Sequence, residues 1–204
     1  TMLKDQGCQQ VVYADTSRGR HGSIFQPVSL RPKLDDAEWT GYGSKITKLA
    51  EKFADFGVRM AFHHHMGTIV ETEAEVDLLM SNTGPAVGLL VDTGHITYAG
   101  GNPLGMTKRH ANRINHVHCK DVRLKVLKEA KAKDWSFLDA VLAGVFTVPG
   151  DGGIDFAAFA KLLAGIRYGG WVVVEAEQDP VKAPPFQYAQ MGHDHLTKLF
   201  TEAR

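Results

Sequence analysis

The sequence lacks the features that would place the protein in a membrane, on nucleic acid or outside the cell. Only two cysteines, Cys8 and Cys119, occur among its 204 residues, which is too few for a disulfide framework. No apolar run approaches the roughly 20 residues that span a bilayer, and the first residues show no signal-peptide pattern. The 23 basic and 23 acidic residues balance, and no basic block is present. We therefore expect a cytoplasmic protein that binds neither membranes nor nucleic acid.

Signatures of nucleotide binding are also missing. No GxGxxG motif follows a first strand, which disfavours a dinucleotide-binding sheet. The glycine-rich stretch at 150–153 would let a ligand approach the backbone, but it lacks the GK[ST] ending of a phosphate loop. A 44% apolar composition at this length is typical of one globular domain, and we assign residues 1–204 to it.

Strand-like and helix-like segments alternate five times along the chain. This alternation predicts a parallel sheet with helical crossovers. A complete (β/α)8 barrel has eight strands and about 250 residues. We therefore expect a partial (β/α)8 TIM barrel of about five C-terminal βα units, whose first three strands lie outside this sequence. The expected strands are 9–15, 58–62, 87–92, 114–120 and 170–177. The expected helices are 34–56, 72–80, 104–113, 135–142, 157–166 and 188–202, after the last turn of a helix at 2–7. Loops are expected at 16–32, 94–103 and 146–156, and a basic, helix-prone surface insertion at 122–133.

Three consecutive histidines follow the second expected strand, in GVRMAFHHHMGT (57–68). Side chains alternate along a strand, so His63 and His65 are predicted to share one face and His64 to take the other. Imidazoles at the end of a buried strand are costly without a partner, and a divalent metal is one such partner. Histidines satisfied by hydrogen bonds, with no metal, are the alternative.

Three other strands also end in side chains that can bind a metal or transfer a proton. Because the carboxyl ends of parallel strands meet at one edge of a sheet, we expect these groups to form one site. Mixed nitrogen and oxygen donors favour Mn or Co, with Zn as a third choice, over Mg or Ca. The groups are Asp92, His95, His116, His118, Lys120, Asp121, Glu175 and Glu177.

Five segments resemble the xylose isomerase-like barrel superfamily, and within it the inosose dehydratases of myo-inositol catabolism. They are AFHHHMGT (61–68), GLLVDTGHITYAGG (88–101), HVHCKDVR (116–123), FTVPGDGGIDF (146–156) and WVVVEAEQDP (171–180). The resemblance implies a hydro-lyase that dehydrates 2-keto-myo-inositol (scyllo-inosose) to a trihydroxycyclohexane-1,2-dione with a divalent metal, and it makes glutathione a candidate cofactor. A sugar or keto-polyol epimerase or isomerase of the same superfamily is one alternative. The other alternative is an inactive barrel fragment that self-associates, because an incomplete barrel has open sheet edges. A homo-oligomer is a candidate assembly.

The same resemblance implies roles for individual residues. In the superfamily a Glu, an Asp, a His and a second Glu at strand ends hold the metal. Asp92, His118 and Glu175 match the last three positions, and His63 stands at the first, with His65 as the alternative ligand.

Catalytic and substrate-binding roles are hypotheses for the remaining groups. Dehydration of a ketone requires one group to take a carbon-bound proton and one to protonate the departing hydroxyl. We expect Glu177, Lys120 and His95 to supply these groups; the alternative for Glu177 is to orient a histidine. The substrate is expected to contact His65, His95, Asp121 and Arg123, and the alternative for Asp121 and Arg123 is to pair with each other.

Overall fold

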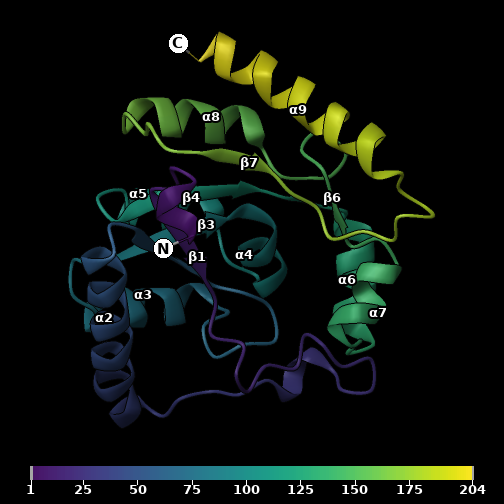
Figure 1. Ribbon diagram of the computed structural model, residues 1–204. Coiled ribbons are helices and arrows are strands. Elements are labelled where there is room, and N and C mark those ends of the chain that lie inside the picture. The colour runs from purple at the N-terminus through teal and green to yellow at the C-terminus, as the bar shows by residue number, and fades with distance from the viewer. Residues whose placement is uncertain (1, 204) are drawn as a thin grey trace.

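Five parallel strands form the framework of the computed structural model, which describes residues 2–203. They lie in the order β1 (Gln10–Tyr13), β2 (Arg59–His63), β3 (Val87–Asp92), β4 (Ile114–Cys119) and β7 (Val172–Val174). Every neighbouring pair is parallel, which confirms the expected sheet with helical crossovers. The sheet is open, with β1 and β7 at its two edges, and forms a partial barrel (Figure 1).

Helices connect the strands and cover the sheet. Figure 1 shows α8 and α9 packed beside β7, and α2 and α3 at the other end of the sheet. Apolar side chains of strands and helices form one core, in which Phe62, Leu89 and Val91 are fully buried. The helices that match the expected ones are α2 (Trp39–Asp55), α3 (Glu73–Asn82), α5 (Pro103–Arg109), α7 (Phe137–Leu142), α8 (Phe156–Gly165) and α9 (Pro185–Glu202), and the short elements α1 (Met2–Asp5), η1 (Val28–Leu30) and η2 (Asp36–Glu38) complete the N-terminal part.

The segment after β3 is a helix, α4 (Thr93–Ala99), where a loop was expected. Its first turn is capped by Asp92, whose Oδ1 accepts a hydrogen bond from the backbone N–H of His95 at 2.8 Å. Gly100, at φ +92°, ends the helix in the left-handed conformation. The cap fixes His95 close to the end of β3.

The segment 122–133 is mostly helical, as its composition predicted, but the prediction that it is a surface insertion is wrong. This segment forms β5 (Asp121–Val122) and α6 (Leu124–Ala132), and β5 pairs antiparallel with β6 (Phe146–Thr147). The inner face of α6 is buried with α7 in a second hydrophobic cluster, because apolar residues recur at helical spacing between the lysines. The fully or nearly buried members are Met66, Tyr98, Val122, Leu127, Ala130, Phe137, Ala140, Val145 and Phe146.

Candidate metal and catalytic site

Metal-ligating atoms from four strand ends converge around Asp92. Its Oδ2 lies 3.4 Å from Nε2 of His63 and 3.5 Å from Nδ1 of His118. His118 Nδ1 is in turn 3.2 Å from Oε2 of Glu175. The sheet register produces this convergence: Asp92 is the partner of His118, and His118 is the partner of Val173, two residues before Glu175. The structure thus brings together all four residues expected to hold the metal.

A second group of polar atoms lies directly beside this quartet. Glu177 Oε1 is 3.6 Å from Nε2 of His65, and its Oε2 is 3.3 Å from Nε2 of His95. The ammonium of Lys120 joins the two groups, at 2.7 Å from Glu177 Oε2, 2.9 Å from His95 Nε2 and 3.0 Å from Glu175 Oε2. The residues expected to be catalytic therefore form one contact network.

The three consecutive histidines separate as the strand alternation predicted. His63 and His65 lie on the site side, with ring centroids 5.4 Å apart, and the ring of His65 is 3.9 Å from that of His95. His64 is fully buried, and its Nε2 accepts the backbone N–H of Asp92 at 3.2 Å. Burial, and after it the neighbouring His63, lowers the pKa of His64 to about 3, so it serves as a neutral support behind β3.

Burial and charge set the protonation states of the network. Burial alone would lower the pKa of His118, but its contacts with Asp92 and Glu175 raise that pKa to about 9. Burial, assisted by the Lys120 ammonium, holds the pKa of His95 well below its usual range. Burial alone would raise the pKa of Glu177, but its contacts with histidines and Lys120 hold it far below the usual range. The site thus combines ionised carboxylates with a neutral His95.

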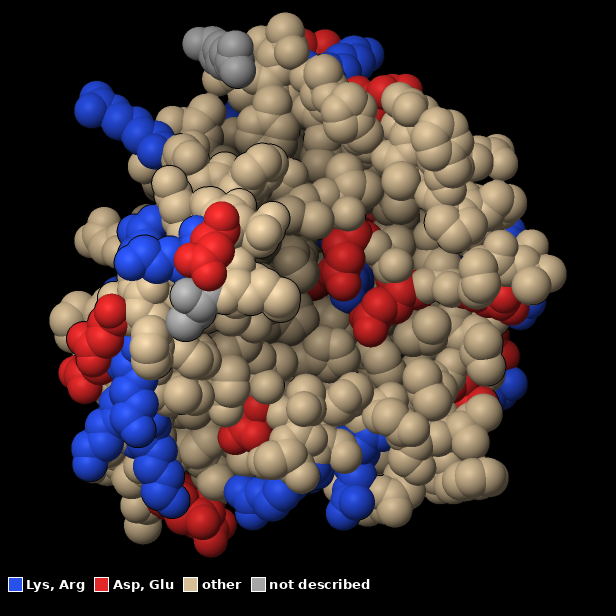
Figure 2. Space-filling view, viewed as in Figure 1, with Lys and Arg blue, Asp and Glu red and all other residues tan. Residues whose placement is uncertain are grey.

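The donor set fits a divalent metal. Ligand atoms of Asp92, His118 and Glu175 all lie within 4.8 Å of one another, as do those of His63, Asp92 and His95. His118 Nδ1 and Glu175 Oε2 are buried and have no well-directed hydrogen bond, although they lie 3.2 Å apart and Lys120 Nζ is 3.0 Å from Glu175 Oε2. Buried polar atoms without such a bond are costly, and a shared cation would satisfy both. Figure 2 shows acidic side chains gathered in the hollow near the middle of this face.

Asp121 and Arg123 are placed differently from what was expected. The two oxygens of Asp121 accept four backbone N–H groups, of Val122, Gly150, Gly152 and Ile154, at 2.8–3.1 Å. Arg123 binds Asp151, with Nη2 to Oδ2 at 2.6 Å, together with carbonyls of the same loop.

The alternative in which Asp121 and Arg123 pair with each other is therefore wrong, because each is committed to the 144–154 loop. In this arrangement neither side chain is directed at the metal-ligand quartet. Both side chains bind the segment 144–154, which contains β6 and the loop that follows it.

Two contributions to the site were not anticipated. The loop at 14–34 brings His21 against the ring of His65, with centroids 5.1 Å apart. Phe137 and Phe146 form an aromatic wall: the Phe137 ring is 6.0 Å from that of His95, and Lys120 Nζ lies 4.9 Å over Phe146. The length of the loop was a signal for His21, whereas nothing local in the sequence marked the two phenylalanines.

Comparison with known proteins identifies relatives along the whole chain. It is 59% identical over 203 residues to the rhizopine catabolism protein MocC of Rhizobium meliloti, covering 100% of this chain and 62% of that protein. Inosose dehydratases are similar too: the one from Salmonella typhimurium is 48% identical over 170 residues (83% of this chain, 56% of the relative), and the one from Clostridium beijerinckii is 41% identical over 196 residues (95% and 66%). The chain thus spans about three-fifths of the length of the curated relatives it matches.

Solved structures share the fold at low sequence identity. A zinc-bound IolI protein matches with a TM-score of 0.69 and 19% identity, covering 99% of this chain and 66% of that one. L-ribulose 3-epimerase matches with a TM-score of 0.69 and 16% identity, covering 100% and 65%. No helix within residues 2–203 is long and apolar enough to cross a membrane. The family model described as xylose isomerase-like TIM barrel matches residues 2–199 of this chain. The chain therefore belongs to the xylose isomerase-like TIM barrel family.

Proposed function

We propose that this chain carries the active site of an inosose dehydratase, a metal-dependent hydro-lyase that removes water from 2-keto-myo-inositol to give a trihydroxycyclohexane-1,2-dione. The observation that carries the proposal is the convergence of Asp92, His118, Glu175 and His63 next to Glu177 and Lys120, in a chain 41–48% identical to inosose dehydratases. The epimerase likeness rests on structures under 20% identical and supports the fold alone.

The metal-ligand quartet would hold one divalent cation. Bound there, the cation supplies Lewis-acid polarisation of the ketone oxygen, which makes the neighbouring carbon-bound proton more acidic. Nitrogen and oxygen donors together support Mn or Co, and the zinc in the IolI structure keeps Zn as a candidate. Glutathione stays a proposal that rests on the family resemblance.

Exposure favours Glu177 over Lys120 and His95 for the proton-transferring role. The Glu177 side chain is 29% exposed, whereas the side chains of Lys120 and His95 are both 0% exposed. The Glu177 carboxylate accepts the proton from carbon once substrate binding loosens the contacts with Lys120 and the histidines that hold its pKa low, and the resulting carboxylic acid returns the proton to the departing hydroxyl, so that one water leaves and the protein is unchanged. Lys120 and His95 act through Glu177, because they position its carboxylate before the substrate binds.

A second candidate substrate comes from the relative at 59% identity. The name of that protein places it in rhizopine catabolism, so rhizopine belongs in the same substrate panel as the keto-inositol. We propose that the protein is cytosolic. The free cysteines Cys8 and Cys119 support this location, because thiols stay reduced in the cytosol.

Metal content and water loss together test the proposal. The purified chain is analysed for bound metals and assayed for the new dione absorbance with 2-keto-myo-inositol. The variant Asp92→Ala, His118→Ala removes two ligands, and the variant His193→Ala, Asp194→Ala is its control, since it removes the same residue types from the exposed face of α9.

We expect near-stoichiometric Mn, Co or Zn and dione formation in the wild-type chain and in the control, and loss of both in the ligand variant. Metal that persists in the ligand variant would refute the site. A chain that holds metal but converts the substrate without loss of water would refute the hydro-lyase in favour of an isomerase or epimerase. A chain with neither metal nor turnover that self-associates would favour the inactive fragment.

A further inference from the structure

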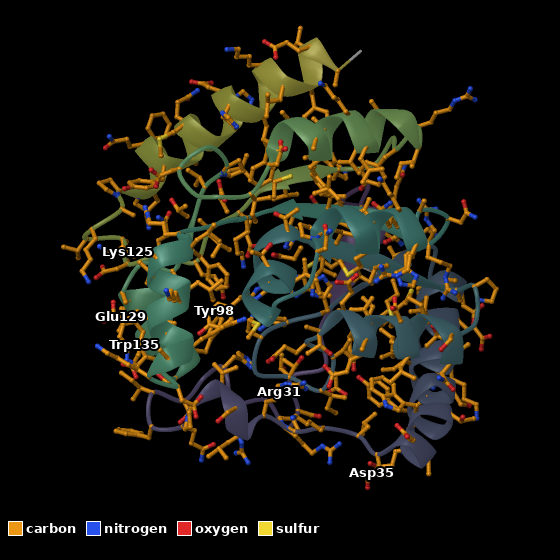
Figure 3. The ribbon with its side chains drawn as sticks, turned by 180° about the vertical axis from the view of Figure 1, so that it is seen from behind. Arg31, Asp35, Tyr98, Lys125, Glu129 and Trp135 are labelled. Carbon is orange, nitrogen blue, oxygen red and sulfur yellow. The ribbon has the colours of Figure 1, made fainter. Side chains whose placement is uncertain are left out.

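Hydrogen bonds attach the loop at 14–34 to the rest of the protein, and three of these attachments are at Arg20, Val28 and Arg31. Arg20 donates its backbone N–H to the carbonyl of Gly67 at 2.7 Å, just after the histidine run. The backbone N–H of Val28 binds the carbonyl of Trp135, at 3.3 Å, in the turn before α7 (Figure 3 labels Trp135). The third attachment is Arg31, which lies within the buried part of the loop.

Arg31 connects the loop to the segment that follows β2. Its guanidinium contacts Glu71 Oε1 at 3.1 Å and Glu75 Oε1 at 2.7 Å, and it donates to the carbonyls of Thr68 and Ile69. The Arg31 side chain, labelled in Figure 3, is only 6% exposed, so its contacts are well shielded from water. The loop is therefore a fixed wall of the site.

His21 stands on this wall, between the first two attachments. Gly67, at φ +74°, lets the loop approach so closely that a Cβ there would lie 2.8 Å from the backbone nitrogen of His21. The His21 ring packs edge-to-face on His65, whose Nε2 is 3.6 Å from Glu177. His21 thus lies one ring beyond the proposed proton-transferring group.

The His21 ring has no hydrogen bond to any residue within 2–203. The Nδ1 atom of the His21 ring is buried without a hydrogen-bond partner, and Gly19 of the same loop lies close to it. The Nε2 atom is therefore the ring nitrogen that a ligand can reach. An imidazole held in a fixed wall without a protein partner is suited to a ligand hydroxyl, which can both donate and accept a hydrogen bond.

We propose that His21 is a specificity-determining contact that hydrogen-bonds a hydroxyl group of the polyol substrate, on the side of the ring away from the metal. The inference rests on the proposed function for the identity of the polyol, and it extends the site to a loop outside the metal and catalytic groups. A six-membered polyol carries hydroxyls around its whole edge, so a ring whose ketone faces the metal presents another hydroxyl to His21.

Two substitutions separate hydrogen bonding from packing. His21→Phe keeps the ring contact with His65 but has no ring nitrogen, whereas His21→Gln keeps a polar nitrogen without the aromatic ring. Affinity for 2-keto-myo-inositol and for myo-inositol is measured by calorimetry on the metal-loaded chain, with His193→Phe on the exposed part of α9 as control. We expect His21→Phe to weaken binding about tenfold, the equivalent of one hydrogen bond. His21→Gln should retain most of the affinity, and the control all of it.

A second measurement needs no variant. The ring-nitrogen NMR signals of His21 in the wild-type chain should shift when myo-inositol is added, and a monodeoxy-inositol that lacks the contacted hydroxyl should bind wild type and His21→Phe equally. The proposal is overturned if His21→Phe binds like wild type, if both variants lose affinity equally, or if the His21 signals do not move. Turnover to the dione with an unchanged KM in His21→Phe would overturn this inference and leave the proposed function standing. If affinity depends on His21 but the substrate is converted without loss of water, the proposed function is refuted and this inference stands.

Discussion

Replacing Asp121 by Asn should destabilise the fold strongly although it removes no side-chain volume. The carboxylate accepts Val122 N–H and Ile154 N–H at Oδ1, at 2.8 and 2.9 Å, and Gly150 N–H and Gly152 N–H at Oδ2, at 3.1 and 3.0 Å. An amide has one acceptor oxygen, so in Asp121→Asn its NH2 group must face two of these donors.

The size of the effect follows from this count. A buried donor left without an acceptor costs about 1–3 kcal/mol. Two of them would cost about 2–6 kcal/mol, and the lower part of that range applies because the bonds from Gly150 and Gly152 are only partly buried. We therefore expect the free energy of unfolding to fall by about 2–4 kcal/mol, a large fraction of the roughly 5–15 kcal/mol that stabilises a domain.

Urea unfolding followed by far-ultraviolet circular dichroism measures this change, with Asp194→Asn as control because Asp194 is exposed on α9 and its substitution should change stability by less than about 0.5 kcal/mol. A substrate-binding role for Asp121 makes the opposite prediction: stability within about 0.5 kcal/mol of wild type and a loss of substrate affinity alone. That outcome would refute the loop-organising role derived from the structure.

Three further predictions concern stability: two concern the loop that forms a wall of the site, and one concerns the start of α3. Arg31→Met should lower the free energy of unfolding by about 3 kcal/mol, because it leaves the Glu71 carboxylate buried without its cation, and chemical denaturation measures this loss. Gly67→Ala should lower the melting temperature and detach the loop, since φ is +74° and the new Cβ would collide with the backbone of His21; a melting temperature equal to wild type would contradict the close approach. Thr72→Ala removes the N-cap of α3 and should cost about 1 kcal/mol, whereas Thr72→Ser should restore it.

The strand-and-helix order was predictable because apolar periodicity is local. Short apolar runs that end in polar or charged residues located all five strands of the sheet. Helix α4 was missed because its start depends on Asp92 acting as an N-cap, and glycines before and after the segment suggested a loop. The burial of α6 was missed because its lysines mask a narrow apolar stripe at Leu127 and Ala130.

The site was predictable for a topological reason. Parallel strands bring their carboxyl ends to one edge, so residues far apart in sequence, such as His63 and Glu175, had to be close once the sheet was parallel. The positions of Asp121 and His21 had no such constraint. Asp121 accepts hydrogen bonds from loop backbone amides whose positions the sequence does not reveal. His21 reaches the site because its loop is attached at Arg20, Val28 and Arg31.

The charges of the site explain why a divalent cation fits it better than hydrogen bonds alone. Asp92, Glu175 and Glu177 are three carboxylates in contact with a single ammonium, Lys120, and the nearest other basic groups are imidazoles. Protonation of His118, whose pKa is raised to about 9, offsets one of the two remaining negative charges and leaves the other in a largely buried setting, which is costly. One divalent metal among His63, Asp92, His118 and Glu175 would take the place of that proton and balance both charges.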